Sequence, residues 1–186
     1  MTDMKPSSAD GRYTGTAIAL HWLIAILIIG GFWLGWVMTD IPGLTPTKLR
    51  YFSWHKWIGV TVFALAWLRV LWRLTHPAPP LPAGMPALQR LVSNAVHGLL
   101  YALMILIPAS GYLYSAAAGV QVVYLGILPL PTLIGPDQQL KVIFRLTHIY
   151  LNYALLGLFA LHLLGVFKHT LIDRDGLLSR MIPFLR

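Results

Sequence analysis

The chain has 186 residues, of which 57% are hydrophobic and only 11% are charged, and its formal net charge is +8. Soluble domains carry about 25% charged residues, so this composition indicates an integral membrane protein. The absence of cysteine excludes disulfides, iron–sulfur clusters and thiolate chemistry. Because the basic residues lie at the ends of apolar segments, the positive charge indicates lipid headgroups rather than nucleic acid as a partner.

Four apolar segments are predicted to cross the membrane as helices. Each is long enough, since about 20 helical residues span the hydrocarbon core. The predicted spans cover residues 16–38, 52–74, 91–114 and 145–168. A signal peptide is the rival interpretation of the first segment, but its apolar run is too long and no A-x-A cleavage site follows it. We therefore expect a single domain over residues 1–186, an all-α four-helix transmembrane bundle.

The segments between the spans are rich in turn formers. Residues 39–51 hold two prolines and a glycine, and residues 76–86 hold five prolines, which predict an extended loop. Residues 115–140 are apolar but interrupted by three prolines, so we interpret them as an interfacial or re-entrant segment. The tail after His169 is typical of a short amphipathic piece lying on the membrane surface.

The distribution of lysine and arginine predicts the orientation. With four spans, nine of the fourteen basic residues fall on the side of both termini, which places that side in the cytoplasm. The opposite side carries only two acids, so it is positive and would attract a small anion. The cations expected there are Lys48, Arg50, Lys56, Lys141 and Arg145.

Two histidines, His148 and His162, lie within the last span. Fourteen residues of helix rise about 21 Å and make nearly four turns, so both imidazoles lie near one face at different depths. An imidazole in hydrocarbon is costly unless both ring nitrogens have partners. Metal ligation by one nitrogen and a hydrogen bond from the other would satisfy both.

Depth predicts a partner for each of these histidines. His21, near the cytoplasmic end of the first span, can face His162, and His55, near the outer end of the second span, can face His148. Each pair would hold a six-coordinate b-type haem, one near each membrane face, as electron transfer across a bilayer requires. Zinc is the weaker interpretation of the metal.

Glycine spacing supports this prediction and also leaves an alternative open. Gly35 lies fourteen residues after His21, where a flat macrocycle needs a small residue on the same face. However, His97 in the third span likewise has Gly111 fourteen residues later. Spacing alone does not decide whether His21 or His97 is the partner of His162. A packing residue and a quinone contact are the other interpretations of His97.

The sequence resembles the bacterial cytochrome b561 family over nearly its whole length. The resemblance rests on ALHWL around His21, WHKWIG around His55, RLTHPAPP after the second span, IPASGYLYS in the third, the histidine spacing in the fourth and SRMIP near the end. It implies a protein of the bacterial inner membrane with two non-covalently held haem b groups. The ligands implied by the resemblance are His21, His55, His148 and His162, and His97 is then free.

The resemblance also implies electron exchange with the quinone pool, and one member of the family oxidises superoxide and reduces ubiquinone. We therefore expect the outer cations to attract superoxide, and a quinone to bind near the cytoplasmic side. The residues whose depth suits the quinone site are Arg69, Arg73, His97, Lys168 and His169. His76 is not among the functional residues that the resemblance implies, and no role is assigned to it.

Two other functions fit the same residues. The chain could be the cytochrome b anchor subunit of a dehydrogenase or hydrogenase, which needs the haems but no substrate of its own. It could also be a non-redox membrane protein that binds haem without transferring electrons. A redox partner protein and a homodimer are both open possibilities.

Overall fold

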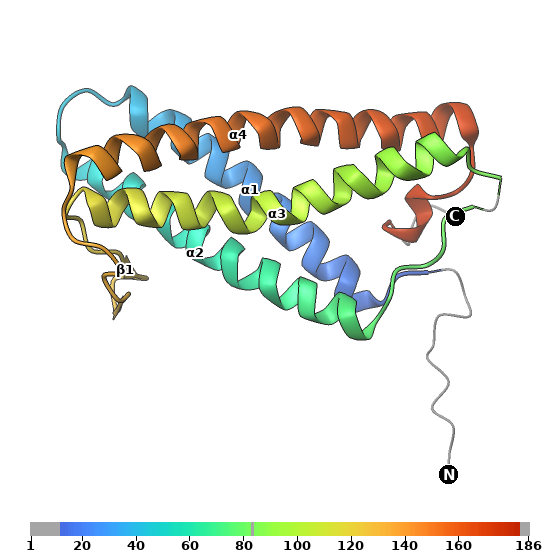
Figure 1. Cartoon of the computed structure of the whole chain (residues 1–186), viewed down its shortest axis with the longest axis horizontal. Coiled ribbons are helices and arrows are strands. Elements are labelled where there is room, and N and C mark those ends of the chain that lie inside the picture. Colours follow the sequence, from blue (N-terminus) through green and yellow to red (C-terminus); the bar gives the residue numbers. More distant parts are fainter. Residues whose placement is uncertain (1–11, 83, 183–186) are drawn as a thin grey trace, which may run out of the picture.

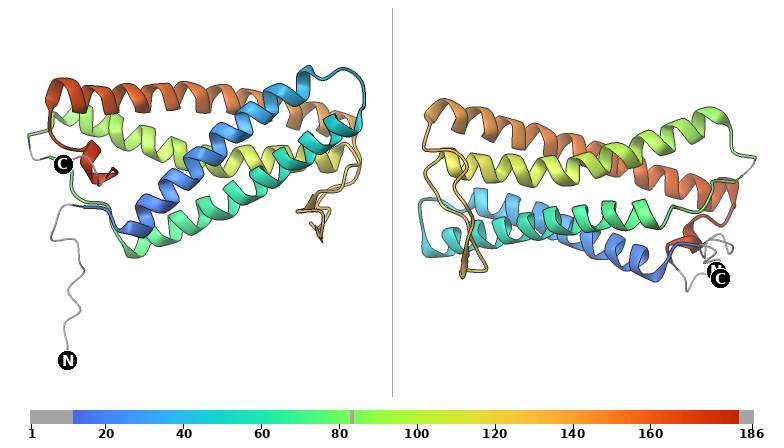
Figure 2. Two further views of the ribbon diagram at one scale, coloured as in Figure 1. Left: turned by 180° about the vertical axis from the view of Figure 1, so that it is seen from behind. Right: turned by 60° about the horizontal axis from the view of Figure 1, so that its bottom comes forward.

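The computed structural model describes residues 12–82 and 84–182, which form a bundle of four long helices (Figures 1 and 2). These helices are α1 (Gly15–Asp40), α2 (Pro46–Thr75), α3 (Ala87–Ala117) and α4 (Gln138–Phe167). All four are long and apolar enough to cross a membrane. The predicted fold class, an all-α multi-pass membrane bundle, is therefore confirmed.

The bundle consists of two helical hairpins packed side by side. Helix α1 packs against α2, α3 packs against α4, and α2 joins the two hairpins by packing against α3. Both ends of the described chain lie at one end of the bundle, which we call the terminus end (Figure 1). The connection between α3 and α4 lies at the other end, which we call the hairpin end.

Polar side chains determine where the helices begin. The Thr45 hydroxyl accepts a hydrogen bond from the Lys48 backbone N–H at 3.2 Å, and the Asp137 carboxylate accepts from the N–H groups of Gln139 and Leu140 at 2.8 and 2.9 Å. Helices α2 and α4 begin at residues 46 and 138, six and seven residues before the predicted spans, because a helix starts at its cap rather than where its hydrophobic stretch starts. Helices α1 and α3 extend only slightly beyond their predicted bounds.

The bundle has a small interior and an apolar exterior. Leu103 and Ile107 of α3 and Leu155 of α4 are buried and form the central cluster. Many large apolar side chains point outward instead, such as Trp36, which is 75% exposed, and Leu164, which is 64% exposed. In water this surface would cause aggregation, whereas in a bilayer it contacts acyl chains.

The connection between α3 and α4 contains a small β-hairpin. Strands β1 (Val123–Tyr124) and β2 (Leu128–Pro129) are antiparallel, with Val123 opposite Pro129. Three residues connect the strands, and Leu125 and Gly126 in this loop have positive φ angles of 53° and 74°, which let the chain reverse tightly. The indole N–H of Trp57 donates to the Val123 carbonyl at 2.8 Å, which holds the hairpin against α2. Of the segment predicted to be interfacial or re-entrant, residues 118–137 connect α3 and α4 without an α-helix and include this hairpin.

The chain after α4 folds back over the terminus end. A π-helical turn, η1 (Lys168–Asp173), is followed by a reversal in which Arg174 and Gly176 have φ angles of 50° and 73°, and then by η2 (Leu178–Arg180). The Trp22 indole N–H of α1 donates to the Met181 carbonyl at 2.9 Å. The described tail therefore consists of short turns, and its contact with Trp22 docks it on α1. Residues 183–186, also part of the predicted piece, lie outside the described residues.

Candidate functional site

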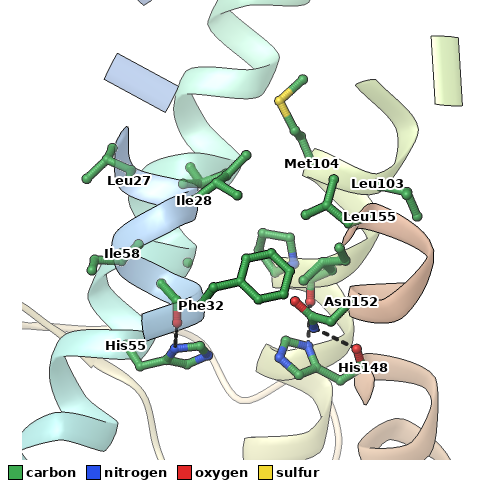
Figure 3. A pocket seen from close by; sticks show the side chains of 15 residues that line it. Leu27, Ile28, Phe32, His55, Ile58, Leu103, Met104, His148, Asn152 and Leu155 are labelled. Atoms are coloured by element: carbon green, nitrogen blue, oxygen red, sulfur yellow. Dashed lines mark hydrogen bonds between the residues drawn. The ribbon is translucent and has the colours of Figure 1, made fainter. Parts of the chain in front are cut away.

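His55 of α2 and His148 of α4 face each other near the hairpin end (Figure 3). Their ring centroids are 6.1 Å apart and their planes are inclined by 83°. Two metal–nitrogen bonds of about 2 Å, plus about 1 Å from each nitrogen to its ring centre, give a separation of about 6 Å. The two rings are therefore spaced as they would be with one metal ion between them.

Hydrogen bonds fix which nitrogen each ring offers. The Nδ1 atom of His55 lies 3.0 Å from the Gly31 carbonyl oxygen, and that of His148 lies 3.0 Å from the Ile107 carbonyl oxygen. A carbonyl oxygen only accepts, so each Nδ1 carries the proton and donates it. Each Nε2 therefore keeps its lone pair, and such a hydrogen bond also orients a metal-ligating ring. The Ser110 hydroxyl, 3.1 Å from Nδ1 of His148, adds a second polar contact.

Two glycines make room for these rings. A Cβ atom built on Gly111 would lie 3.0 Å from Cε1 of His148, and one built on Gly35 would lie 3.4 Å from Cε1 of His55. The missing side chains let the imidazoles lie directly against the neighbouring helices. Gly35 thus lies beside the hairpin-end pair, at the depth opposite to that of His21, as its spacing predicted.

A cavity of about 70 Å³ extends from the hairpin-end pair toward the middle of the bundle (Figure 3). Its walls are apolar and include Phe32, Leu103 and Leu155. The polar exception is Asn152, whose amide donates to the His148 carbonyl at 2.7 Å. Apolar walls with two facing imidazole nitrogens suit a flat hydrophobic metal complex such as haem, and the donor set therefore fits that group.

His21 of α1 and His162 of α4 form the corresponding pair at the terminus end. Their ring centroids are 6.4 Å apart and their planes are inclined by 74°. This separation is close to that of the other pair and again leaves space for one metal ion. Helix α4 contributes one histidine to each pair. His148 belongs to the hairpin-end pair, and His162, fourteen residues later, belongs to the terminus-end pair.

His97 of α3 lies closer to His162 than His21 does. The centroids of His97 and His162 are 5.2 Å apart, which is shorter than the separation of about 6 Å expected for two opposed axial ligands. His97 is exposed, and its Nδ1 atom is 2.7 Å from the carbonyl oxygen of Ser93, one turn earlier. Its position supports His21 as the opposite partner of His162, with His97 beside the pair.

The geometry does not favour zinc at these histidines. A zinc site needs several ligand atoms gathered around one point. Among the described residues, the only three His or Asp ligand groups within 4.8 Å of one another are His169, Asp173 and Asp175. The nitrogen of the neighbouring Lys168 lies 2.5 Å from Asp173, so this cluster is an ion-pair network already compensated by a cation.

The cations predicted for the outer surface lie toward the hairpin end, within about the first three turns of α2 and α4. Arg50 and Arg145 are exposed, whereas Lys48, Lys56 and Lys141 are half-buried. Lys48 donates to the Ile41 carbonyl at 2.7 Å and so also closes the loop between α1 and α2. Within residues 12–82 and 84–182 none of the five forms an ion pair, so their charges add to a positive surface.

The structure separates the residues predicted for the quinone side. Lys168 and His169 join the Asp173 and Asp175 network, in which His169 Nδ1 lies 2.5 Å from Asp175. Arg73 is exposed, whereas Arg69, one turn earlier, is half-buried and contacts α1 and α3. His76 stacks on Trp72 with a centroid distance of 4.0 Å and is exposed.

Sequence reasoning missed three polar residues of the bundle interior. Ser110 and Asn152 contact His148, and Tyr101 binds Arg69. Each is a polar residue inside an apolar span, which was an available signal. Their partners could not be identified, because the sequence of one span does not show which side of the helix faces which neighbouring helix.

The chain is similar to known membrane cytochromes. A family model described as prokaryotic cytochrome b561 matches residues 12–184. "Cytochrome b561 homolog 2" of Escherichia coli (strain K12) is 34% identical over 180 residues, which cover 96% of this chain and 95% of that protein. "Cytochrome b561 homolog 1" of the same organism is 26% identical over 178 residues, or 92% of this chain and 97% of that protein.

Proposed function

Because this chain belongs to the prokaryotic cytochrome b561 family, whose members are haem b membrane cytochromes of electron transfer, we propose that it is a di-haem cytochrome that oxidises superoxide and reduces ubiquinone. The observation that carries the proposal is the presence of two facing histidine pairs, with ring separations of 6.1 and 6.4 Å, at two depths of one bundle. Two redox sites at different depths would let electrons cross the membrane in steps.

In this proposal four imidazoles would hold the two haems. His55 with His148 would hold one haem, and His21 with His162 would hold the other. When bound, the two haems would supply one-electron redox chemistry at two depths of the membrane. Ligation by two histidines would favour outer-sphere electron transfer over oxygen binding. The Nδ1 hydrogen bonds of His55 and His148 keep those rings oriented for ligation.

The hairpin end receives superoxide in this proposal. Its basic residues raise the local concentration of a small anion, and the exposed Arg50 and Arg145 contribute most directly. Each of two superoxide ions gives up one electron and leaves as dioxygen. One ubiquinone takes up both electrons and two protons to become ubiquinol, so charge and atoms balance.

The terminus end receives ubiquinone and faces the cytoplasm of a bacterial inner membrane in this proposal. The excess of lysine and arginine on that side supports this orientation. Hydrogen bonds or protons for the quinone would come from His97, Arg73, Lys168 and His169. In the structure one ring nitrogen of His169 contacts Asp175 at 2.5 Å and the other lies 3.1 Å from the Gln89 amide nitrogen.

The test is a reduced-minus-oxidised spectrum with haem quantitation on the purified protein, followed by additions of superoxide and ubiquinone. We expect two haems per chain, reduction by superoxide and reoxidation by ubiquinone. Two haems that do not respond to superoxide would contradict the proposed substrate and favour the electron-transfer subunit of a larger complex. A colourless protein would contradict the haem sites themselves.

Neutralising the cations of the hairpin end is expected to slow the reaction with superoxide. The triple variant Arg50→Gln, Lys141→Gln, Arg145→Gln should lower the second-order rate at low ionic strength about tenfold and flatten its dependence on salt, because steering by charge is screened by salt. Stopped-flow or pulse-radiolysis measurements over a range of salt concentrations would check this.

The matched control removes three cations from the other end, Arg73→Gln, Arg174→Gln and Arg180→Gln, and changes the net charge equally. If steering is local, the control keeps a steeper salt dependence than the first triple variant. Equal rates in the two triple variants at every salt concentration would refute local steering.

A further inference from the structure

Arg69 is a guanidinium inside a membrane-spanning helix. It lies six residues before the end of α2, or about 9 Å along the helix. It is half-buried, whereas Arg73, one turn later, is exposed and nearer the helix end. An arginine stays charged in proteins, and a charge within a span is costly unless it is compensated. Arg69 therefore needs a functional or structural reason.

Neighbouring helices hold the Arg69 side chain in place. Its Nε–H donates to the Tyr101 hydroxyl of α3 at 2.8 Å, and an Nη1–H donates to the Ala17 carbonyl of α1 at 3.2 Å. The guanidinium carbon lies 5.5 Å from the centre of the Tyr101 ring. Ala17 is one helical turn before His21, so the cation is held close to the terminus-end histidine pair. These contacts use two of the five N–H groups of the guanidinium and leave the other three.

The described part of the chain offers no carboxylate to neutralise Arg69. Two of the six acids lie at the hairpin end, two are bonded to Lys168 and His169, and two fall within residues 1–11, outside the described residues. These acids are, in that order, Asp40, Asp137, Asp173, Asp175, Asp3 and Asp10. The two contacts that Arg69 makes, a hydroxyl and a backbone carbonyl, are neutral. The site thus has oriented donors and a positive charge but no anion from residues 12–82 and 84–182.

We propose that Arg69, supported by Tyr101, binds a carboxylate of the haem held by His21 and His162. This inference rests on the proposed function, since it needs a haem at that pair. Haem b carries two carboxylates, and a guanidinium fork binds a carboxylate through two parallel hydrogen bonds. The Tyr101 hydroxyl accepts from Arg69 and still has its own proton to donate. The pair would thus orient this haem and remove the uncompensated charge from the bundle.

A quinone is the alternative occupant of the Arg69 site. A quinone headgroup is neutral and can accept a hydrogen bond, but it does not compensate a charge within the membrane. The cofactor carboxylate satisfies both the donors and the charge, so the observations favour it. The quinone-side role expected for Arg69 from depth alone is replaced here by a cofactor-anchoring role.

Haem titration of the cofactor-free full-length protein in detergent micelles tests the inference. The probes are haem b and its dimethyl ester, in which both carboxylates are blocked. In the Arg69→Gln variant, one of the two binding steps for haem b should weaken at least tenfold and the other should not change. The Arg69→Lys variant should recover part of the loss. The Arg90→Gln variant is the control, because it removes an exposed cation of the terminus end to which no binding role is assigned, and it should bind haem as the unmodified chain does.

Comparing haem b with its dimethyl ester shows whether Arg69 contacts a haem carboxylate or only stabilises the helix bundle. The unmodified chain should prefer haem b to the ester at the terminus-end site at least tenfold, and Arg69→Gln should abolish that preference. If the preference is absent in the unmodified chain, or is the same in Arg69→Gln, the inference is wrong. If instead added ubiquinone lowers the affinity for haem in the unmodified chain but not in Arg69→Gln, Arg69 binds the quinone and the inference is wrong. Failure of the unmodified chain to bind any haem would refute the proposed function rather than this inference alone.

Discussion

Replacing His148 with alanine is expected to halve the haem content of the purified protein, from two haems per chain to one. The imidazole of His148 has no substitute, because the ring facing it belongs to His55 and the nearby Ser110 and Asn152 bind iron poorly. A haem with one remaining axial ligand should bind at least tenfold more weakly and lose its six-coordinate spectrum. Haem quantitation against protein concentration, together with a redox titration, measures both effects.

The complementary variant is His162→Ala, which should remove the other haem and leave the first. Two variants that each lose one haem, with different reduction potentials for the haem that remains, would support two independent sites on α4. Retention of both haems with unchanged spectra in either variant would refute the assignment of ligands.

The variant His97→Ala distinguishes the two candidate partners of His162. If His21 is the ligand, His97→Ala keeps both haems and His21→Ala loses one. The opposite result would make the 5.2 Å neighbour of His162 the ligand and would contradict the argument from ring separation. His76→Ala is the control for histidine loss in general, since His76 is exposed and stacked on Trp72.

Replacing Gly111 with valine is expected to disrupt the hairpin-end site without removing any ligand. Even a Cβ atom at this position would lie 3.0 Å from Cε1 and 3.1 Å from Nδ1 of His148. The ring cannot easily move away, because its Nδ1 atom is bonded to the Ile107 carbonyl. Overpacking of this kind costs about 1–3 kcal/mol, which corresponds to about a 5-fold to 150-fold loss of affinity for the haem at this pair.

The matched control is Gly98→Val in the same helix. A Cβ atom on Gly98 meets nothing within 4 Å, so the variant has the same change in helix propensity without the clash. Absorption spectra and haem titrations should show one altered site in Gly111→Val and none in Gly98→Val. If the two variants behave alike, the close approach of α3 to His148 has no role in binding.

The sequence alone determined the membrane class, the presence of four long apolar helices and the position of every histidine along its helix. Hydrophobic length is a local property, and the rise and turn of a helix place residues separated by fourteen on one face. For this reason helix geometry predicted His148 opposite His55 and left His21 and His97 as alternative partners of His162, of which the family resemblance favoured His21. In the structure His55 lies 6.1 Å from His148 and His21 lies 6.4 Å from His162, measured between ring centroids. The sequence analysis did not identify Thr45 and Asp137 as the N-caps of α2 and α4, and it placed the charged turns that follow them outside the spans.

Only the tertiary structure decided which side chains face each other across helices. It placed His97 beside His162 at 5.2 Å, turned Arg69 inward to Tyr101 while leaving Arg73 exposed, and set the Ile107 carbonyl behind His148. These relations depend on the rotation of each helix about its axis and on its distance from its neighbours. In a membrane both are determined by the packing of small residues such as Gly111 and by hydrogen bonds between helices. Such interactions join residues far apart in the chain, so no single span contains the information.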